Sequence, residues 1–100
     1  MAYEVRIDPD DGTPPARLEF GEYKQLFAAM VEARPSFLAP LKRFRGPHAR
    51  FDIAAEHVPA VLDEIAAIRN LAGQWPFLTE LDRVTRRAHV THAGLRGRSP

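Results

Sequence analysis

The feature that most constrains the fold is an alternating stretch that runs directly into an amphipathic helix. Ala49, Phe51 and Ile53 alternate with polar residues, and this period of two predicts a half-buried strand. Over about 56–71 the apolar spacing changes to three and four, which predicts a helix. Its apolar stripe consists of Val58, Val61, Leu62, Ile65, Ile68 and Ala72. Because each element has one apolar face, we expect the two to cover each other and form the core.

The rest of the chain divides into strands and helices by the same criterion of apolar spacing. The predicted strands are about 3–8, 16–20, 41–45 and 48–53. The predicted helices are about 21–33, 56–71 and 76–90. Two hairpins in this order predict an α+β fold: a small antiparallel sheet of three to four strands, with three helices packed mainly on one face.

The length of 100 residues fits a single domain, which we expect to comprise residues 1–93. The last residues, 94–100, read GLRGRSP and show no apolar periodicity. This segment is therefore expected to be a flexible C-terminal tail.

Three features predict a cytoplasmic protein without a membrane segment. No apolar run approaches the roughly 20 residues that span a bilayer. The N-terminal stretch MAYEVRIDPDDG is acidic and alternating, unlike a secretory signal. The absence of cysteine excludes disulfides and thiolate chemistry and is compatible with a reducing compartment.

The net charge of +1 hides a segregation of charge along the chain. Residues 34–50 carry five basic side chains and no acidic one, and residues 83–100 carry five arginines and no acid. Residues 51–82 carry six acids against Arg69 alone. Either the basic segments fold beside acidic ones and are neutralised, or they form a surface that faces an anionic partner.

No catalytic or cofactor motif is present. The two serines, Ser36 and Ser99, lie outside any nucleophile-elbow pattern, and the glycines are scattered singly without phosphate-loop spacing. His89 and His92 are three apart and are the only weak candidates for metal ligands, but no third ligand has a suitable spacing. We therefore expect no cofactor, no metal site and no catalytic residue, and an enzyme is the third of the functions that the sequence leaves open.

Candidate contact residues fall into three groups. The basic hairpin of residues 42–50 offers Lys42, Arg43, Phe44, Arg45 and Arg50, which could grip phosphates and stack on bases or instead protect a sheet edge. Arg83 and Arg87 share a face of the last helix, where they could extend a cationic surface or complement the helix dipole. The third group consists of the acidic pair Asp63 and Glu64 and of Trp75, which either anchors a partner or closes the core.

The pattern as a whole is typical of a small non-enzymatic binding or regulatory protein that acts through protein–protein contacts. An inhibitor or immunity-type factor is one form of this hypothesis, and a homodimer is another state it allows. The alternative is a nucleic-acid-binding module that uses the basic hairpin of residues 42–50 and the basic last helix.

Overall fold

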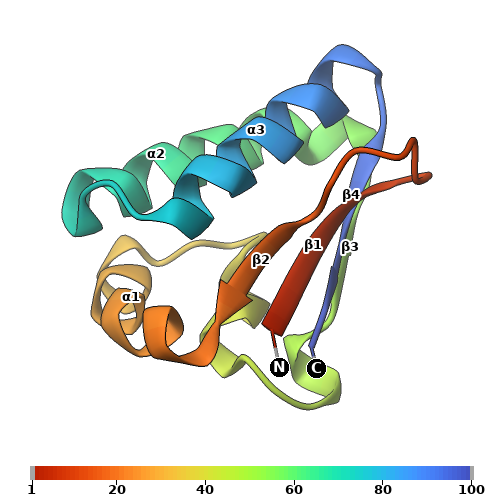
Figure 1. The fold of residues 1–100 in the computed structure, drawn as a ribbon. Helices are drawn as coiled ribbons and strands as arrows, with labels where there is room; N and C mark the ends of the chain where they lie inside the picture. Colours follow the sequence, from red (N-terminus) through yellow and green to blue (C-terminus); the bar gives the residue numbers. More distant parts are fainter. Residues whose placement is uncertain (1, 100) are drawn as a thin grey trace.

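The computed structural model describes residues 2–99, which form a four-stranded antiparallel sheet with three α-helices on one side (Figure 1). The strands are β1 (Ala2–Asp8), β2 (Ala16–Glu19), β3 (Phe51–Ile53) and β4 (Gly94–Arg98). The α-helices are α1 (Phe20–Ala33), α2 (Val58–Ala72) and α3 (Pro76–Val90). Short 3₁₀ helices are η1 (Ala39–Arg43), η2 (Pro47–Ala49) and η3 (Ala55–His57). The predicted α+β class is confirmed.

The predicted core between strand and helix is present. Val61 and Ile65 of α2 belong to the same buried cluster as Phe51 and Ile53 of β3, and each of the four side chains is less than a tenth exposed. Helix α2 ends where the sequence indicated, because Gly73 adopts a positive φ of 85° and its N–H donates to the carbonyl of Arg69. The stripe therefore sets the position of the central helix and Gly73 sets its end, while its start is two residues later than predicted, because residues 55–57 form η3.

The first predicted hairpin is confirmed by the pairing of β1 with β2. Tyr3 lies opposite Leu18 and Val5 lies opposite Ala16, all four of them buried. The residues between them face away from the helices, so the alternation of apolar and polar residues in the sequence matches the alternation of side chains between the two faces of the sheet.

The predicted edge strand 41–45 is wrong, because this segment is the 3₁₀ helix η1 followed by a tight turn. Pro40 has no N–H for a strand ladder but fits the first turn of a helix. Leu41 and Phe44 are both buried, at a spacing of three rather than two, and Phe44 has a positive φ of 58°. Strand 48–53 is correspondingly shortened to β3, since residues 47–49 form η2.

The predicted flexible tail is also wrong over residues 94–98, which form β4 in the interior of the sheet. The strand order is β2-β1-β4-β3, so β4 pairs with both β1 and β3 and the second predicted hairpin does not exist. Leu95 points into the core, and Gly97 leaves room for the Phe51 ring and the Tyr3 hydroxyl on the same face. The two ends of the chain consequently lie side by side (Figure 1).

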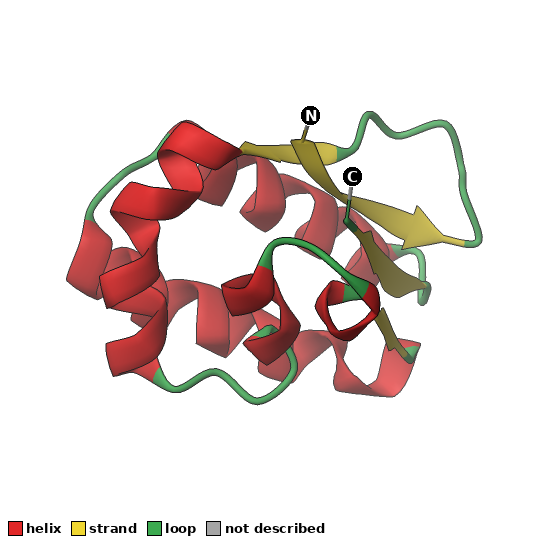
Figure 2. Ribbon diagram, turned by 90° about the horizontal axis from the view of Figure 1, so that it is seen from below, coloured by secondary structure: helices red, strands yellow, loops and turns green. Residues whose placement is uncertain are grey.

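Figure 2 shows the strands with the helices on one side of them. The other face of the sheet carries charged side chains that pair with one another. Arg96 lies 3.5 Å from Asp8 and 3.4 Å from Asp52, and Arg98 lies 3.2 Å from Asp52. Arg17 lies 3.7 Å from Glu4. The arginines of the last strand are therefore neutralised within the molecule, as one of the two interpretations of the charge pattern predicted.

Candidate functional site

Helix α1 exposes apolar side chains on the face opposite to its core contacts. Phe20, Phe27 and Val31 are 45%, 42% and 46% exposed, and they recur at spacings of seven and four along one side of the helix. Leu26 and Met30, by contrast, are fully buried on the other side. A row of exposed large apolar residues on a single helix face marks a contact surface more often than isolated exposed residues do.

Aromatic packing holds the segment of residues 39–48 against this helix. The Phe44 ring is buried, with its centroid 4.9 Å from that of Tyr23 and 5.4 Å from that of Phe20. The Tyr23 hydroxyl donates a hydrogen bond to the main-chain carbonyl of Lys42. Burial raises the pKa of Tyr23 above its ordinary value. Helix η1 is thus fixed beside α1.

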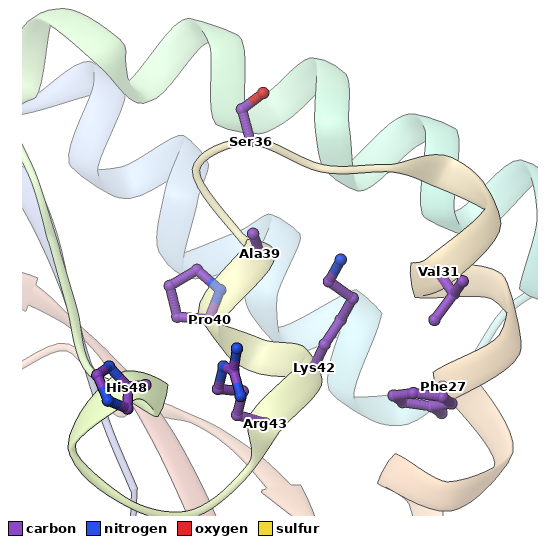
Figure 3. Close-up of a pocket in the computed structure, with 8 residues that line it drawn as sticks. All are labelled: Phe27, Val31, Ser36, Ala39, Pro40, Lys42, Arg43 and His48. Carbon is purple, nitrogen blue, oxygen red and sulfur yellow. The ribbon is translucent and has the colours of Figure 1, made fainter.

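A cavity of about 630 Å³ opens between these two elements (Figure 3). Phe27 and Val31 border it from α1, while Lys42 rises from η1 between the two elements. Its lining residues are Phe27, Val31, Ser36, Ala39, Pro40, Lys42, Arg43 and His48. A smaller hollow of about 260 Å³, lined by Tyr23, Lys24 and Phe27, shares the Phe27 ring with the first. Volumes of several hundred Å³ are typical of sites that enclose a bound group.

We call this region the α1–η1 surface. It comprises Phe20, Tyr23, Lys24, Phe27 and Val31 of α1, together with Lys42, Arg43, Arg45 and His48. The Arg45 guanidinium lies 5.2 Å from the centre of the Phe20 ring, and the Lys24 ammonium lies 5.8 Å from it. Cations therefore border the exposed apolar row directly.

The cations of this surface have no acidic partner within residues 2–99. No ion pair there includes Lys24, Lys42, Arg43 or Arg45, and none includes Arg34 or Arg50, which lie outside the surface as defined. Elsewhere in the same residues every arginine is ion-paired except Arg83, which donates to a carbonyl. The charge segregation thus has two outcomes: neutralisation over most of the molecule, and unpaired positive charge around the α1–η1 surface.

The structure brings only some of the predicted basic contacts together. Arg43, Arg45 and Arg50 are exposed, but Phe44 is 1% exposed, so its ring is not available for a surface contact. The reason is the tight turn after η1, which points residue 44 into the core instead of along an edge strand.

The second predicted basic group holds a loop of the protein itself. Arg87 lies 3.3 Å from Asp11, and Arg83 donates a hydrogen bond of 3.1 Å to the carbonyl of Pro14. Figure 1 shows this loop between β1 and β2 at the other end of the sheet from the segment of residues 39–49. The two basic groups therefore do not form one continuous surface.

Glu64 was predicted to lie on an exposed acidic face, but its carboxylate binds the protein's own backbone. Oε2 accepts hydrogen bonds from the N–H groups of Ser36 and Phe37, each 3.0 Å long, and Oε1 accepts one of 2.9 Å from Leu38. This carboxylate ties the loop between α1 and η1 to α2. Its neighbour Asp63 remains exposed.

Trp75 helps to close the core rather than standing free on the surface. Its ring is partly buried against the core cluster, and its Nε1 donates a hydrogen bond of 2.9 Å to the carbonyl of Ala72. The residue immediately precedes α3 and so connects the ends of two helices. Of the two predicted roles, this arrangement supports the structural one.

His89 and His92 do not share a helix face. His89 lies in the last turn of α3, whereas His92 follows the helix with a positive φ of 56°, and both are exposed. Within residues 2–99, no three His, Asp or Glu side chains are grouped so as to hold a metal ion. None of the helices in this part of the chain is both long and apolar enough to cross a lipid bilayer.

The α1–η1 surface offers chemistry for binding anionic and apolar groups together. Ser36 and His48 both border the large cavity, but no hydrogen bond joins them among the described residues, and Figure 3 shows the Ser36 hydroxyl pointing away from His48. They therefore lack the geometry of a nucleophile and its base.

Comparison of the chain with protein-family models, curated proteins and solved structures found no significant match in any of the three.

Proposed function

We propose that this protein acts by docking an acidic segment of a protein partner on the α1–η1 surface. The observation that carries the proposal is the exposed row Phe20, Phe27 and Val31 beside cations that have no acidic partner of their own. Full burial of a fully exposed side chain of this kind contributes roughly 1.5–3 kcal/mol, and because these three are already more than half buried, docking can add up to about half of that for each. Unpaired cations around them select acidic partners and accelerate the encounter.

Charge complementarity favours a different protein as the partner over a second copy of this chain. Asp52 pairs with two arginines, Asp82 pairs with Arg86, and Glu64 binds backbone N–H groups. The exposed acids that have no ion pair within residues 2–99 include Glu32 and Asp63, which lie on different helices and so do not form one acidic segment. An inhibitor or immunity-type factor in the cytoplasm is one role that such a docking surface would serve.

A second candidate function is the binding of single-stranded nucleic acid. The exposed Phe20 ring, with Arg45 and Lys24 near its face, combines a stacking platform with cations that could contact phosphates. Because Arg83 and Arg87 are bound to the 11–14 loop, the cationic area is smaller than the sequence predicted. This favours the protein partner.

The test uses two labelled probes: a peptide that combines Glu with Leu, and a single-stranded RNA oligonucleotide. Fluorescence anisotropy at low and at moderate salt measures binding to the whole chain and to the variant Lys42→Gln/Arg43→Gln. The matched control, Arg83→Gln/Arg87→Gln, removes the same charge at the other basic group. We expect the peptide to bind, the first variant to weaken it about tenfold, which corresponds to ~1.4 kcal/mol, and the control to leave it unchanged.

Two results would overturn the proposal. One is no peptide binding at low salt; the other is equal weakening by the test and control variants, which would mean unspecific charge attraction. Tight RNA binding that falls steeply with salt, together with weak peptide binding, would replace the proposal by the second candidate.

A further inference from the structure

We infer that the segment docked on the α1–η1 surface is an amphipathic α-helix that lies along α1. The inference rests on the proposed function and specifies the conformation of the acidic segment. Three observations carry it: the spacing of the apolar anchors, the internal bonding of the backbone groups of α1 and η1, and the position of the cations along the row of anchors.

The exposed apolar residues Phe20, Phe27 and Val31 form a row along α1 that is as long as about three turns of a helix. Phe20 and Val31 are eleven positions apart on one helix, which corresponds to about 16 Å at the usual rise per residue. Phe27 lies between them and borders both the large cavity and the smaller hollow. A partner helix of about three turns, with apolar residues at spacings of three and four, would present a row of matching length.

The backbone of the surface argues against an extended occupant. An extended segment has no internal hydrogen bonds, so each N–H or C=O group that docking buries needs a partner on the surface, and the backbone groups of α1 and η1 bond largely within their own helices. On the apolar row such a segment would leave its backbone groups unpaired, at a cost that a helix avoids because it satisfies its own. The free edges of the sheet are short, since β2 has four residues and β3 has three.

The cations lie beside the apolar row along its length. Lys24 and Arg45 lie near the Phe20 ring at one end of the row, while Lys42 borders the large cavity together with Phe27 and Val31. A helix with one apolar stripe and carboxylates next to that stripe would place those carboxylates toward these groups.

The test compares two synthetic peptides of about fourteen residues and identical composition, Leu and Glu with a few Ala and Gln. In the first, Leu recurs at spacings of three and four; in the second, Leu alternates with polar residues. Anisotropy measures affinity for the whole chain, and circular dichroism measures helix formation on binding. We expect the first peptide to bind at least tenfold more tightly and to gain helical signal.

Matched variants locate the binding. Phe27→Ala and, as a second variant, Val31→Ala should each weaken the first peptide about tenfold, whereas Leu71→Ala should not, although Leu71 is similarly exposed on α2. Far-ultraviolet circular dichroism of each variant alone verifies its fold.

The outcomes separate the two proposals. Equal affinity of both peptides, reduced in each case by Phe27→Ala, would overturn the helical inference and leave acidic docking intact. Binding of neither peptide would overturn both. Unchanged binding by Phe27→Ala and Val31→Ala would place the helix elsewhere and overturn the inference, as would a dimer of the chain alone that Phe27→Ala dissociates.

Discussion

Phe51 and Gly97 face each other across β3 and β4, and the Phe51 ring fills the space that a side chain at residue 97 would need. A Cβ at this position would overlap Cε2 of Phe51 and would lie 2.5 Å from the hydroxyl of Tyr3. We therefore predict that Gly97→Ala lowers the free energy of unfolding by about 1–3 kcal/mol, measured by urea denaturation.

Gly21 provides the matched control for this prediction. It lies in α1, no atom comes within 4 Å of an added Cβ, and its φ is not positive. Gly21→Ala should leave stability unchanged or raise it by up to about 1 kcal/mol. Equal losses in the two variants would show that the crowding at residue 97 is not the cause.

Glu64 gives a second prediction, because one carboxylate accepts hydrogen bonds from three consecutive backbone N–H groups. Glu64→Ala should cost about 1–3 kcal/mol of stability and accelerate hydrogen exchange at Ser36, Phe37 and Leu38. Asp63→Ala, at the exposed neighbouring position, should change neither quantity. Unaltered exchange in the Glu64 variant would mean that the loop is held by other contacts.

From the buried phenol of Tyr3 we predict that the folded protein loses stability in alkaline solution. Burial raises the pKa of its phenol well above the ordinary value of 10.0, and the hydroxyl donates to the carbonyl of Ala49. The folded state thus holds this proton more tightly than the unfolded state, so the contribution is complete below the unfolded pKa and is lost as the pH rises above it. Urea denaturation across this range should show a shallower decline for Tyr3→Phe than for the native chain. An identical decline would contradict the prediction.

From the contacts of the Asp11 carboxylate we predict that the folded protein loses stability as the pH falls. Its hydrogen bonds with Thr13, and secondarily its contact with Arg87, hold the pKa of the carboxyl below its usual range. The contribution is therefore present above the unfolded pKa and is lost as the pH falls through the lower folded pKa. Asp11→Asn should reduce the loss of stability on acidification, measured by denaturation at a series of pH values. The control is Asp10→Asn, because Asp10 accepts a backbone hydrogen bond from Gly12 but has no arginine partner within residues 2–99.

The elements that sequence predicted well are those in which the apolar period matches a buried face. Val61 and Ile65 belong to such a stripe, and Tyr3 and Val5 belong to such an alternation, so the boundaries of α2 and β1 followed closely. Strand β4 was missed because its inward positions include only one large apolar residue, Leu95. The room that makes Gly97 necessary is defined by residues distant in sequence, and no local pattern reports it.

The sequence identified the basic residues of the candidate site but not its exposed apolar residues. Lys42, Arg43 and Arg45 were identified from a segment without acids, and they do border the surface. Phe27 and Val31 were assigned to the helix but not to its exposed face. The sequence shows that this helix has more large apolar residues than one buried face can hold, because a single stripe of α1 could not bury Phe27 and Val31 as well as Leu26 and Met30. Which of them faces water depends on where η1 packs.

The hydrogen bond from Tyr23 to residue 42 ends on the main-chain carbonyl, so it does not depend on which side chain that residue carries. The position of η1 and the charge that it displays are therefore separate properties of the molecule. Substitution at residue 42 would change the charge of the α1–η1 surface while the hydrogen bond that holds η1 stays intact. A surface of this kind is open to rapid divergence, and to deliberate redesign, without a matching loss of folding.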